Sequence, residues 1–210
     1  EIKQLDKEAF KDRNILLGVT GSIAAYKAAE LCSKLVQLGS NVRVIMTRNA
    51  TNFINPTTFE TLTHSTVVVD MFERNLNKTP YHIELTDWAQ CFAIVPATAN
   101  ILAKASCGIA DDALSTAILC FNKEIIFAPA MNPKMWESPA VQNNCKTLRS
   151  LGHIIIEPEE GPLACGAKAK GRLPSLDTIL TVIQQDANSG KAGPTREFID
   201  PVRFISNPSS

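Results

Sequence analysis

The stretch Asn14–Leu38, NILLGVTGSIAAYKAAELCSKLVQL, decides the fold of this chain. It begins with an apolar run and turns through Thr20, Gly21 and Ser22. The apolar residues that follow are spaced by four, three, four and three positions, which places them on one face of a helix: Ala24, Ala28, Leu31, Leu35 and Leu38. We therefore expect a buried strand, a tight turn and a helix, with Ser22 as the N-cap residue and Gly39 just beyond the helix end.

The turn at Gly21 and Ser22 suits an anion, most often a phosphate, because a helix N-terminus presents free N–H groups and a partial positive charge. The alternative is a first strand–helix unit with nothing bound, since such turns also occur in non-binding folds. The next apolar run, Asn41–Met46, ends in Thr47 and Arg48. A dinucleotide fold usually has an acidic residue at this point. A hydroxyl and a cation there, without a GxGxxG pattern, argue against NAD and for a phosphate-bearing mononucleotide.

Composition narrows the class of protein. The chain has 210 residues, enough for one domain or one domain and a fragment, with 45% hydrophobic and 20% charged residues. The 21 basic and 21 acidic residues cancel, which argues against a nucleic-acid surface. No apolar run approaches the ~20 residues of a membrane span. Residues 1–13 are charged and lack an apolar signal core, so we expect a cytoplasmic protein.

The cysteines and histidines show no metal-ligand spacing, so we expect no metal site. None of the six cysteines is in a CxxC pair. Cys32, Cys91 and Cys120 lie in apolar segments and are expected to be reduced core thiols.

Apolar runs and helical segments alternate along the rest of the chain. Further strands are expected at 67–69, 92–95, 124–128 and 154–156, with a mobile surface loop at 157–174 and a closing helix at 176–184. This alternation predicts an α/β domain of the Rossmann-like or flavodoxin-like class, a parallel sheet with helices on both faces. Ligands bind beyond the carboxyl ends of such strands. The turns at 20–22, 47–49, 96–100 and 129–132 should therefore converge on one edge.

Four segments together resemble the flavin-dependent cysteine decarboxylases, in particular the phosphopantothenoylcysteine decarboxylases of coenzyme A biosynthesis. They are GVTGSIAAYKA at 18–28, HIELTDWA at 82–89 with PATAN at 96–100, PAMNPKMW at 129–136, and ACG at 164–166. The resemblance implies decarboxylation of 4′-phosphopantothenoylcysteine to 4′-phosphopantetheine. In it, flavin oxidises the substrate thiol, carbon dioxide leaves, and the product is then reduced.

The tail adds a second resemblance, because AGPTREFIDPVRFISNPSS at 192–210 looks like the start of a phosphopantothenoylcysteine synthetase domain. We therefore expect a decarboxylase domain at 1–185, followed at 186–210 by a linker and the start of a truncated synthetase domain. A complete protein of this kind would also be a ligase, but the ligase domain itself is missing from this sequence.

By this resemblance the cofactor is FMN. Its expected contacts lie on the strand-ending turns and near the flavin ring: Gly21, Ser22, Ile23, Thr47, Arg48, Thr98, Ala99, Asn100, Ile101 and Ala130. The residue types agree with this, because a phosphate is bound by backbone N–H groups, hydroxyls and cations.

The resemblance also implies three residues for the chemistry. His82 would be the base that helps to ionise the substrate thiol, whose pKa of about 8.5 leaves it mostly protonated at neutral pH. Asn132 would bind the substrate carboxylate, and Cys165, beside the substrate contact Ala164, would donate the final proton. Each has a structural alternative: His82 as a helix cap, Asn132 as the N-cap of the next helix, and Cys165 as a spare loop thiol.

Residues 158–172 are expected to form a lid that carries Cys165 over the substrate. Lys168, Lys170 and Arg172 on this lid would meet the substrate phosphate or simply be solvated. Gln90 and Asp112 depart from the common family pattern at positions without a chemical role. The resemblance further implies a homo-oligomer, trimers or dodecamers built from trimers, with flavin sites between subunits.

Three other functions share parts of this pattern. A flavin prenyltransferase has a similar first turn, but the Pro-Ala-Met-Asn and Ala-Cys-Gly segments argue against it. A peptidyl-cysteine decarboxylase differs mainly by lacking the synthetase-like tail. A non-enzymatic flavin-binding regulator of a phosphatase would be expected to have lost His82, Asn132 or Cys165.

Overall fold

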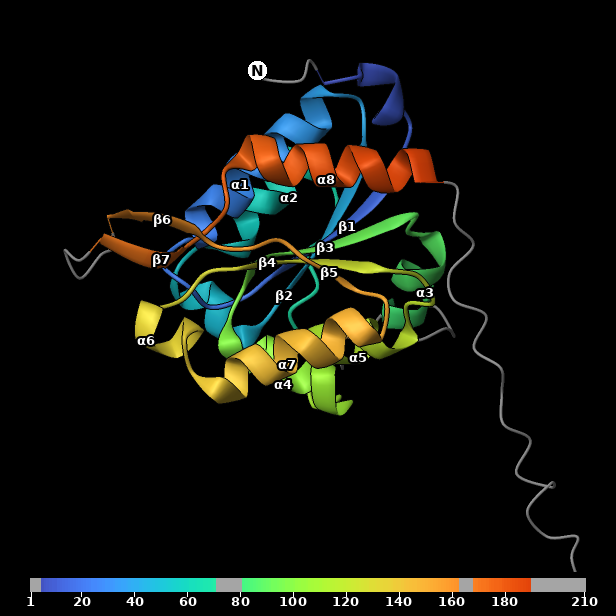
Figure 1. Cartoon of the computed structure of the whole chain (residues 1–210). Helices are drawn as coiled ribbons and strands as arrows, with labels where there is room; N and C mark the ends of the chain where they lie inside the picture. The colour runs from blue at the N-terminus through green and yellow to red at the C-terminus, as the bar shows by residue number, and fades with distance from the viewer. Residues whose placement is uncertain (1–4, 71–80, 163–167, 190–210) are drawn as a thin grey trace, which may run out of the picture.

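The fold is a five-stranded parallel sheet with helices on both faces, as expected (Figure 1). The computed structural model describes residues 5–70, 81–162 and 168–189. The strand order β2-β1-β3-β4-β5 is that of flavodoxin-like folds. The strands are β1 Asn14–Val19, β2 Asn41–Met46, β3 Cys91–Ala97, β4 Ile125–Pro129 and β5 Ile154–Ile155.

Two apolar cores lie on the two faces of this sheet. On one face α1 (Ala25–Gln37), α2 (Pro56–Thr63) and α8 (Leu176–Ser189) pack against Leu17. The other face, with Leu16, is covered by α3 (Tyr81–Trp88), α4 (Ala99–Cys107), α5 (Ala113–Cys120) and α7 (Pro139–Ser150). Neighbouring residues of β1 thus enter opposite cores, as the period-two alternation of a strand requires. The remaining helices of the described ranges are short: η1 (Lys7–Ala9), η2 (Arg48–Asn52) and α6 (Pro133–Trp136).

The first helix confirms the predicted apolar face but not its predicted cap. Ala28, Leu31 and Leu35 are fully buried. The helix begins at Ala25, after Ala24, instead of directly after Ser22. The chain first makes a turn in which the Ala25 N–H donates to the Ser22 carbonyl (2.9 Å). Ser22 Oγ accepts from the Ala24 N–H at 3.3 Å, so the hydroxyl closes this turn and does not cap the helix.

Two predicted segments differ from the structure. The run at 67–69 is an edge contact, in which Val68 alone forms a bridge to Ile45 of β2. The expected loop at 157–174 contains an antiparallel hairpin of β6 (Glu159–Pro162) and β7 (Lys168–Arg172), while residues 163–167 lie outside the described residues. Backbone pairing holds this hairpin together, and its polar and small side chains give no apolar alternation that a sequence could reveal.

The end of the domain extends beyond the predicted closing helix. Helix α8 continues past residue 184 to Ser189 because its last turns are anchored to Arg13. The Arg13 guanidinium donates to the Ile183 carbonyl (2.6 Å) and pairs with Asp186. The division into a decarboxylase domain at 1–185 and a tail at 186–210 stays a prediction.

Further expectations concern cysteines, metals and membranes. Cys32 and Cys91 are buried as expected, but Cys120, the last residue of α5, is exposed and does not belong to the core. Among the described residues, no group of three histidine, cysteine or acidic residues could hold a metal ion. None of the helices in the described ranges has both the length and the apolar character needed to cross a bilayer.

Candidate active site

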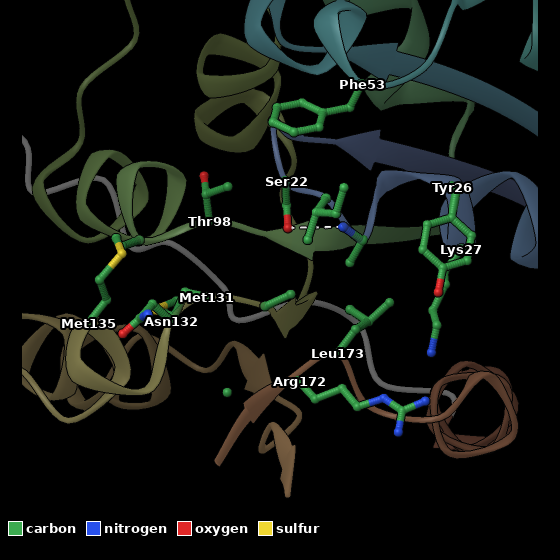
Figure 2. Close-up of a pocket in the computed structure, with 16 residues that line it drawn as sticks. Ser22, Tyr26, Lys27, Phe53, Thr98, Met131, Asn132, Met135, Arg172 and Leu173 are labelled. Atoms are coloured by element: carbon green, nitrogen blue, oxygen red, sulfur yellow. Dashed lines mark hydrogen bonds between the residues drawn. The ribbon is translucent and has the colours of Figure 1, made fainter. Parts of the chain in front are cut away.

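A pocket of about 560 Å³ lies at the carboxyl edge of the sheet, within the size range of small-molecule sites (Figure 2). Its lining comes from the turns after β1, β3 and β4, from α1 and α6, from the residue that follows η2, and from the end of β7 with the residue after it. The lining residues are Gly21, Ser22, Ile23, Ala24, Tyr26, Lys27, Phe53, Thr98, Ala99, Ala130, Met131, Asn132, Met135, Gly171, Arg172 and Leu173. Three of the four predicted turns therefore converge on one cavity.

The fourth turn, after β2, supports the pocket from behind. A Cβ at Gly21 would lie 2.8 Å from Asn49 Cβ and 3.0 Å from the Asn49 carbonyl carbon. Only glycine allows the two turns to approach this closely. Thr47 and Arg48, both expected to contact the cofactor, are not among the lining residues. Thr47 caps η2 by accepting from the Ala50 N–H, and the Arg48 guanidinium is 3.0 Å from Asp70.

A buried hydroxyl joins the turns after β1 and β3. Thr20 Oγ1 donates to the Pro96 carbonyl (2.6 Å) and accepts from the Thr98 N–H (3.1 Å). The Thr98 hydroxyl in turn accepts from the Ile101 N–H and so caps α4. The N-terminal ends of α1 and α4 are thereby fixed beside each other at the cavity, where both favour an anion. Of the expected contacts here, Thr98 and Ala99 line the pocket, whereas Asn100 and the buried Ile101 do not.

The turn after β4 places Asn132 at the cavity, where its side-chain oxygen is hydrogen-bonded and its side-chain amide nitrogen, among the described residues, is not. Asn132 Oδ1 accepts from the Lys134 N–H at 2.9 Å and caps α6. The Nδ2 group makes no hydrogen bond within the described part of the chain, so it remains available to donate to an anion. The structural alternative and the chemical role are therefore compatible, because each uses a different atom of the amide.

The β6–β7 hairpin contacts this turn directly. The Met131 N–H donates to the Gly171 carbonyl at 3.0 Å, and a Cβ on Gly171 would lie 2.4 Å from the Met131 carbonyl oxygen. On the outer side of the hairpin, Glu157 pairs with Lys170 and Arg149. Burial tends to raise the pKa of Glu157, but the Lys170 hydrogen bond and the two positive charges outweigh it and lower the pKa below its usual value.

Large apolar side chains form the open walls of the pocket. Ile23, Tyr26, Phe53 and Met135 are exposed by 67%, 62%, 50% and 48%. Exposed apolar surface gathered around a cavity indicates a ligand or a protein contact. Sequence reasoning missed most of these residues. A signal did exist for Tyr26, which is a large aromatic residue outside the apolar face of α1, whereas nothing around Phe53 marked it.

Three predicted residues fall outside the described part of the chain or of its side chains. Cys165 and Ala164 lie in the gap at 163–167, and the side chain of His82 is not described. The backbone of His82 belongs to α3, which lies at the other end of the molecule from α6 and the hairpin (Figure 1). Helix α3 is anchored where β1 begins, since Asn14 Nδ2 donates to the Trp88 carbonyl at 3.1 Å. None of its described residues, 83–88, lines the pocket.

Two buried thiols are unsuited to chemistry. Burial raises the pKa of Cys32 to about 12. Burial also raises the pKa of Cys91, with Asp186 adding to the rise. Both thiols stay protonated at neutral pH and therefore belong to the core.

Comparisons with known proteins agree with one another. Residues 3–188 match the family described as Flavoprotein, and residues 191–210 match the DNA/pantothenate metabolism flavoprotein C-terminal domain. The coenzyme A biosynthesis bifunctional protein CoaBC of Bacillus subtilis is 44% identical over 95% of this chain and 52% of its own length. The CoaBC protein of Borreliella burgdorferi is 40% identical, with 54% of its length covered. The chain thus spans about half the length of the curated relatives that it matches.

Two solved structures resemble the fold closely. A PPC decarboxylase mutant complexed with pantothenoylaminoethenethiol superimposes with a TM-score of 0.79 at 28% identity, over 85% of this chain and all of that chain. The FMN-dependent cysteine decarboxylase SpaF gives a TM-score of 0.73 at 34% identity, over 85% of this chain and 99% of its own.

Proposed function

The chain belongs to the flavoprotein family, and from that premise we propose that it is an FMN-dependent decarboxylase of 4′-phosphopantothenoylcysteine in coenzyme A biosynthesis. The observation that carries this proposal is Asn132, whose free amide N–H groups stand at an apolar cavity beside two helix N-termini. The relatives support the substrate, since the curated matches are coenzyme A biosynthesis proteins and one solved neighbour is a PPC decarboxylase.

The pocket suits FMN on chemical grounds. Gly21 packs closely against Asn49 behind the turn, which fixes the first turn and its backbone N–H groups at the cavity, where a phosphate is favoured. Ser22 and Thr98 add hydroxyls on this side (Figure 2). The apolar walls, with Ala130 at the end of β4, suit the faces of a flavin ring. When bound, FMN would take two electrons from the substrate thiol and return them after carbon dioxide has left.

The residues of the chain would orient the substrate and move its protons. Asn132 Nδ2 donates to the substrate carboxylate and holds it without adding a charge, so that its later loss as carbon dioxide is not opposed. His82 accepts the thiol proton, because a neutral imidazole is the side chain whose pKa suits this transfer near pH 7. Cys165 returns a proton to the carbon at the end of the reaction. These three roles follow from the family resemblance.

We propose a homo-oligomer with sites shared between copies, and the position of α3 supports the sharing; trimers or dodecamers built from trimers follow from the family resemblance. Helix α3 carries His82 but is anchored at the edge where the strands begin, whereas Asn132 lies at the edge where they end. A second copy that placed its α3 against the open, apolar side of the pocket would supply the base. Ile23, Tyr26 and Phe53 would then be covered by that copy.

We further propose that residues 191–210 begin a synthetase domain, as their match to the C-terminal domain family suggests. A complete protein of this kind would then also carry a ligase activity. A cytoplasmic location fits the cysteines of the described ranges, because none of them forms a disulfide: Cys32, Cys91, Cys107, Cys120 and Cys145.

The test is direct. The FMN-loaded protein is incubated with 4′-phosphopantothenoylcysteine, and carbon dioxide and 4′-phosphopantetheine are measured by mass spectrometry. We expect both products in equal amounts. A yellow, oligomeric protein that released no carbon dioxide would contradict the proposal.

A further inference from the structure

The pocket holds two cations that have no ion pair among the described residues, Lys27 and Arg172. For Arg172 this is unusual among the arginines that the structure describes. The other four arginines in the described ranges are all paired: Arg13 with Asp186, Arg43 with Glu84, Arg48 with Asp70, and Arg149 with Glu157. A guanidinium that lines a cavity and is not paired with a carboxylate is available to bind an anion.

A β-bulge aims Arg172 at the pocket. Glu159 pairs with Arg172 and Glu160 pairs with Lys170, which leaves Gly171 as the extra residue. Without the bulge, Lys170 and Arg172 would share one face of the strand, because they are two positions apart. With it, Lys170 forms its 2.8 Å ion pair with Glu157, while Arg172 lines the cavity.

Two further contacts hold Arg172 in place. The Gly171 carbonyl is bonded to the Met131 N–H, which fixes the backbone beside Asn132. The stem of Arg172 crosses Gly161 so closely that a Cβ there would be 3.0 Å from Arg172 Cδ. In Figure 2, the Lys27 and Arg172 side chains reach toward the same side of the pocket, and Asn132 lies on the opposite side.

We propose that Lys27 and Arg172 bind the terminal phosphate of the substrate and so select phosphorylated pantothenoylcysteine over unphosphorylated or peptidyl cysteine. This rests on the proposed function. The substrate is an elongated molecule with a carboxylate at one end and a phosphate monoester at the other. The pocket has an amide at one side for the first group and two cations at the other side for the second. A peptide ending in cysteine brings the carboxylate but no dianion for the cations.

The phosphate of FMN is the competing occupant of these cations. Ser22 and Thr98, on the helix N-termini that favour a phosphate, lie together and away from Arg172 in Figure 2. The cofactor phosphate therefore has its own donors, and the two cations are left for a second anion.

The experiment compares two substrates on FMN-loaded protein: 4′-phosphopantothenoylcysteine and pantothenoylcysteine. Each charged hydrogen bond to the phosphate is worth about a tenfold change in affinity. In Arg172→Ala and Lys27→Ala, we expect KM for the phosphorylated substrate to rise about tenfold each, with kcat unchanged. KM for pantothenoylcysteine should change less than about twofold, so the preference for the phosphate collapses. Lys146→Ala, which removes an exposed lysine of α7 outside the pocket, is the charge-matched control.

The outcomes are distinct. A lowered FMN content in the variants, measured by absorbance of purified protein, would assign the cations to the cofactor and overturn the proposal. Equal KM changes for both substrates would also overturn it, because a merely structural defect does not sense the phosphate. Arg172→Lys should recover part of the preference. Wild-type protein that released no carbon dioxide from either substrate would instead refute the proposed function.

Discussion

The turn after β1 and the β6–β7 hairpin line the same pocket but are held in different ways. The turn is fixed from within, by the buried Thr20 hydroxyl and by the close approach of Gly21 to Asn49. The hairpin is held by a backbone hydrogen bond from Met131 to Gly171 at the pocket and by a surface ion network around Glu157 on its outer side. The comparison suggests a rigid side for the cofactor and a loosely attached side for the substrate. Substitutions on the two sides should therefore have separable effects.

The largest effect is expected from breaking the rigid side. In Gly21→Val, the new side chain would collide with Asn49, so the turn must move and the FMN site must open. Overpacking of this kind costs about 1–3 kcal/mol, and with the lost donor geometry we expect FMN to bind at least about 100-fold more weakly. FMN titration followed by flavin fluorescence measures this. Ala140→Val, at an exposed position of α7 outside the pocket, is the control for added bulk and should keep its FMN.

The next largest effect is expected where the two sides meet, at Asn132. Asn132→Asp keeps an oxygen that caps α6 but replaces the free amide with a negative charge. The substrate carboxylate is then repelled, and kcat/KM should fall about 30- to 100-fold. FMN content and the thermal midpoint should stay close to those of the wild type. A normal kcat/KM for this variant would remove Asn132 from the site.

A smaller effect is expected from loosening the hairpin. Gly171→Ala places a Cβ against the Met131 carbonyl, so β7 must detach from the turn. We expect KM for the substrate to rise about tenfold while the FMN dissociation constant changes less than about twofold. Steady-state kinetics and flavin titration of the same preparation give both values. Loss of FMN in this variant would show that the hairpin belongs to the rigid side after all.

The smallest effect concerns the outer anchor of the hairpin. The pKa of Glu157 is lower in the folded protein than in the unfolded chain, so its contribution to stability is present above the unfolded pKa and is lost as pH falls through the folded value. The groups are largely exposed, and Glu157→Gln should cost only about 0.5 kcal/mol at pH 7. Thermal unfolding at pH 7 should show this difference, and at about pH 3 it should shrink. A difference independent of pH would contradict the ion-pair explanation.

The sequence predicted the sheet and the turn after β1 better than it predicted the β6–β7 hairpin. The parallel sheet, the turn at Gly21 and the placement of Asn132 could be predicted, because apolar periodicity and strand-ending turns are local signals. The predicted N-cap, Ser22, lies two residues before the observed one, Ala24. A turn at residues 22–25 separates them, and no pattern in the sequence marks such a turn. The hairpin was predicted as a loop, because its stability lies in backbone pairing and in contacts with Met131 and Glu157, far away along the sequence.

The bulge at Gly171 changes which face of strand β7 the later residues occupy, a change of parity. Along a regular strand, odd and even positions face opposite sides, and the assignment never changes. One extra residue reverses this assignment for the positions that follow. Lys170 and Arg172, two positions apart, therefore face opposite sides: Lys170 pairs with Glu157 and Arg172 lines the cavity. Deleting one residue from this short strand would therefore do more than shorten it. The regular alternation of faces would be restored, and Arg172 would turn from the cavity toward Glu157. Lys170 and Arg172 would then compete for the same face of the strand.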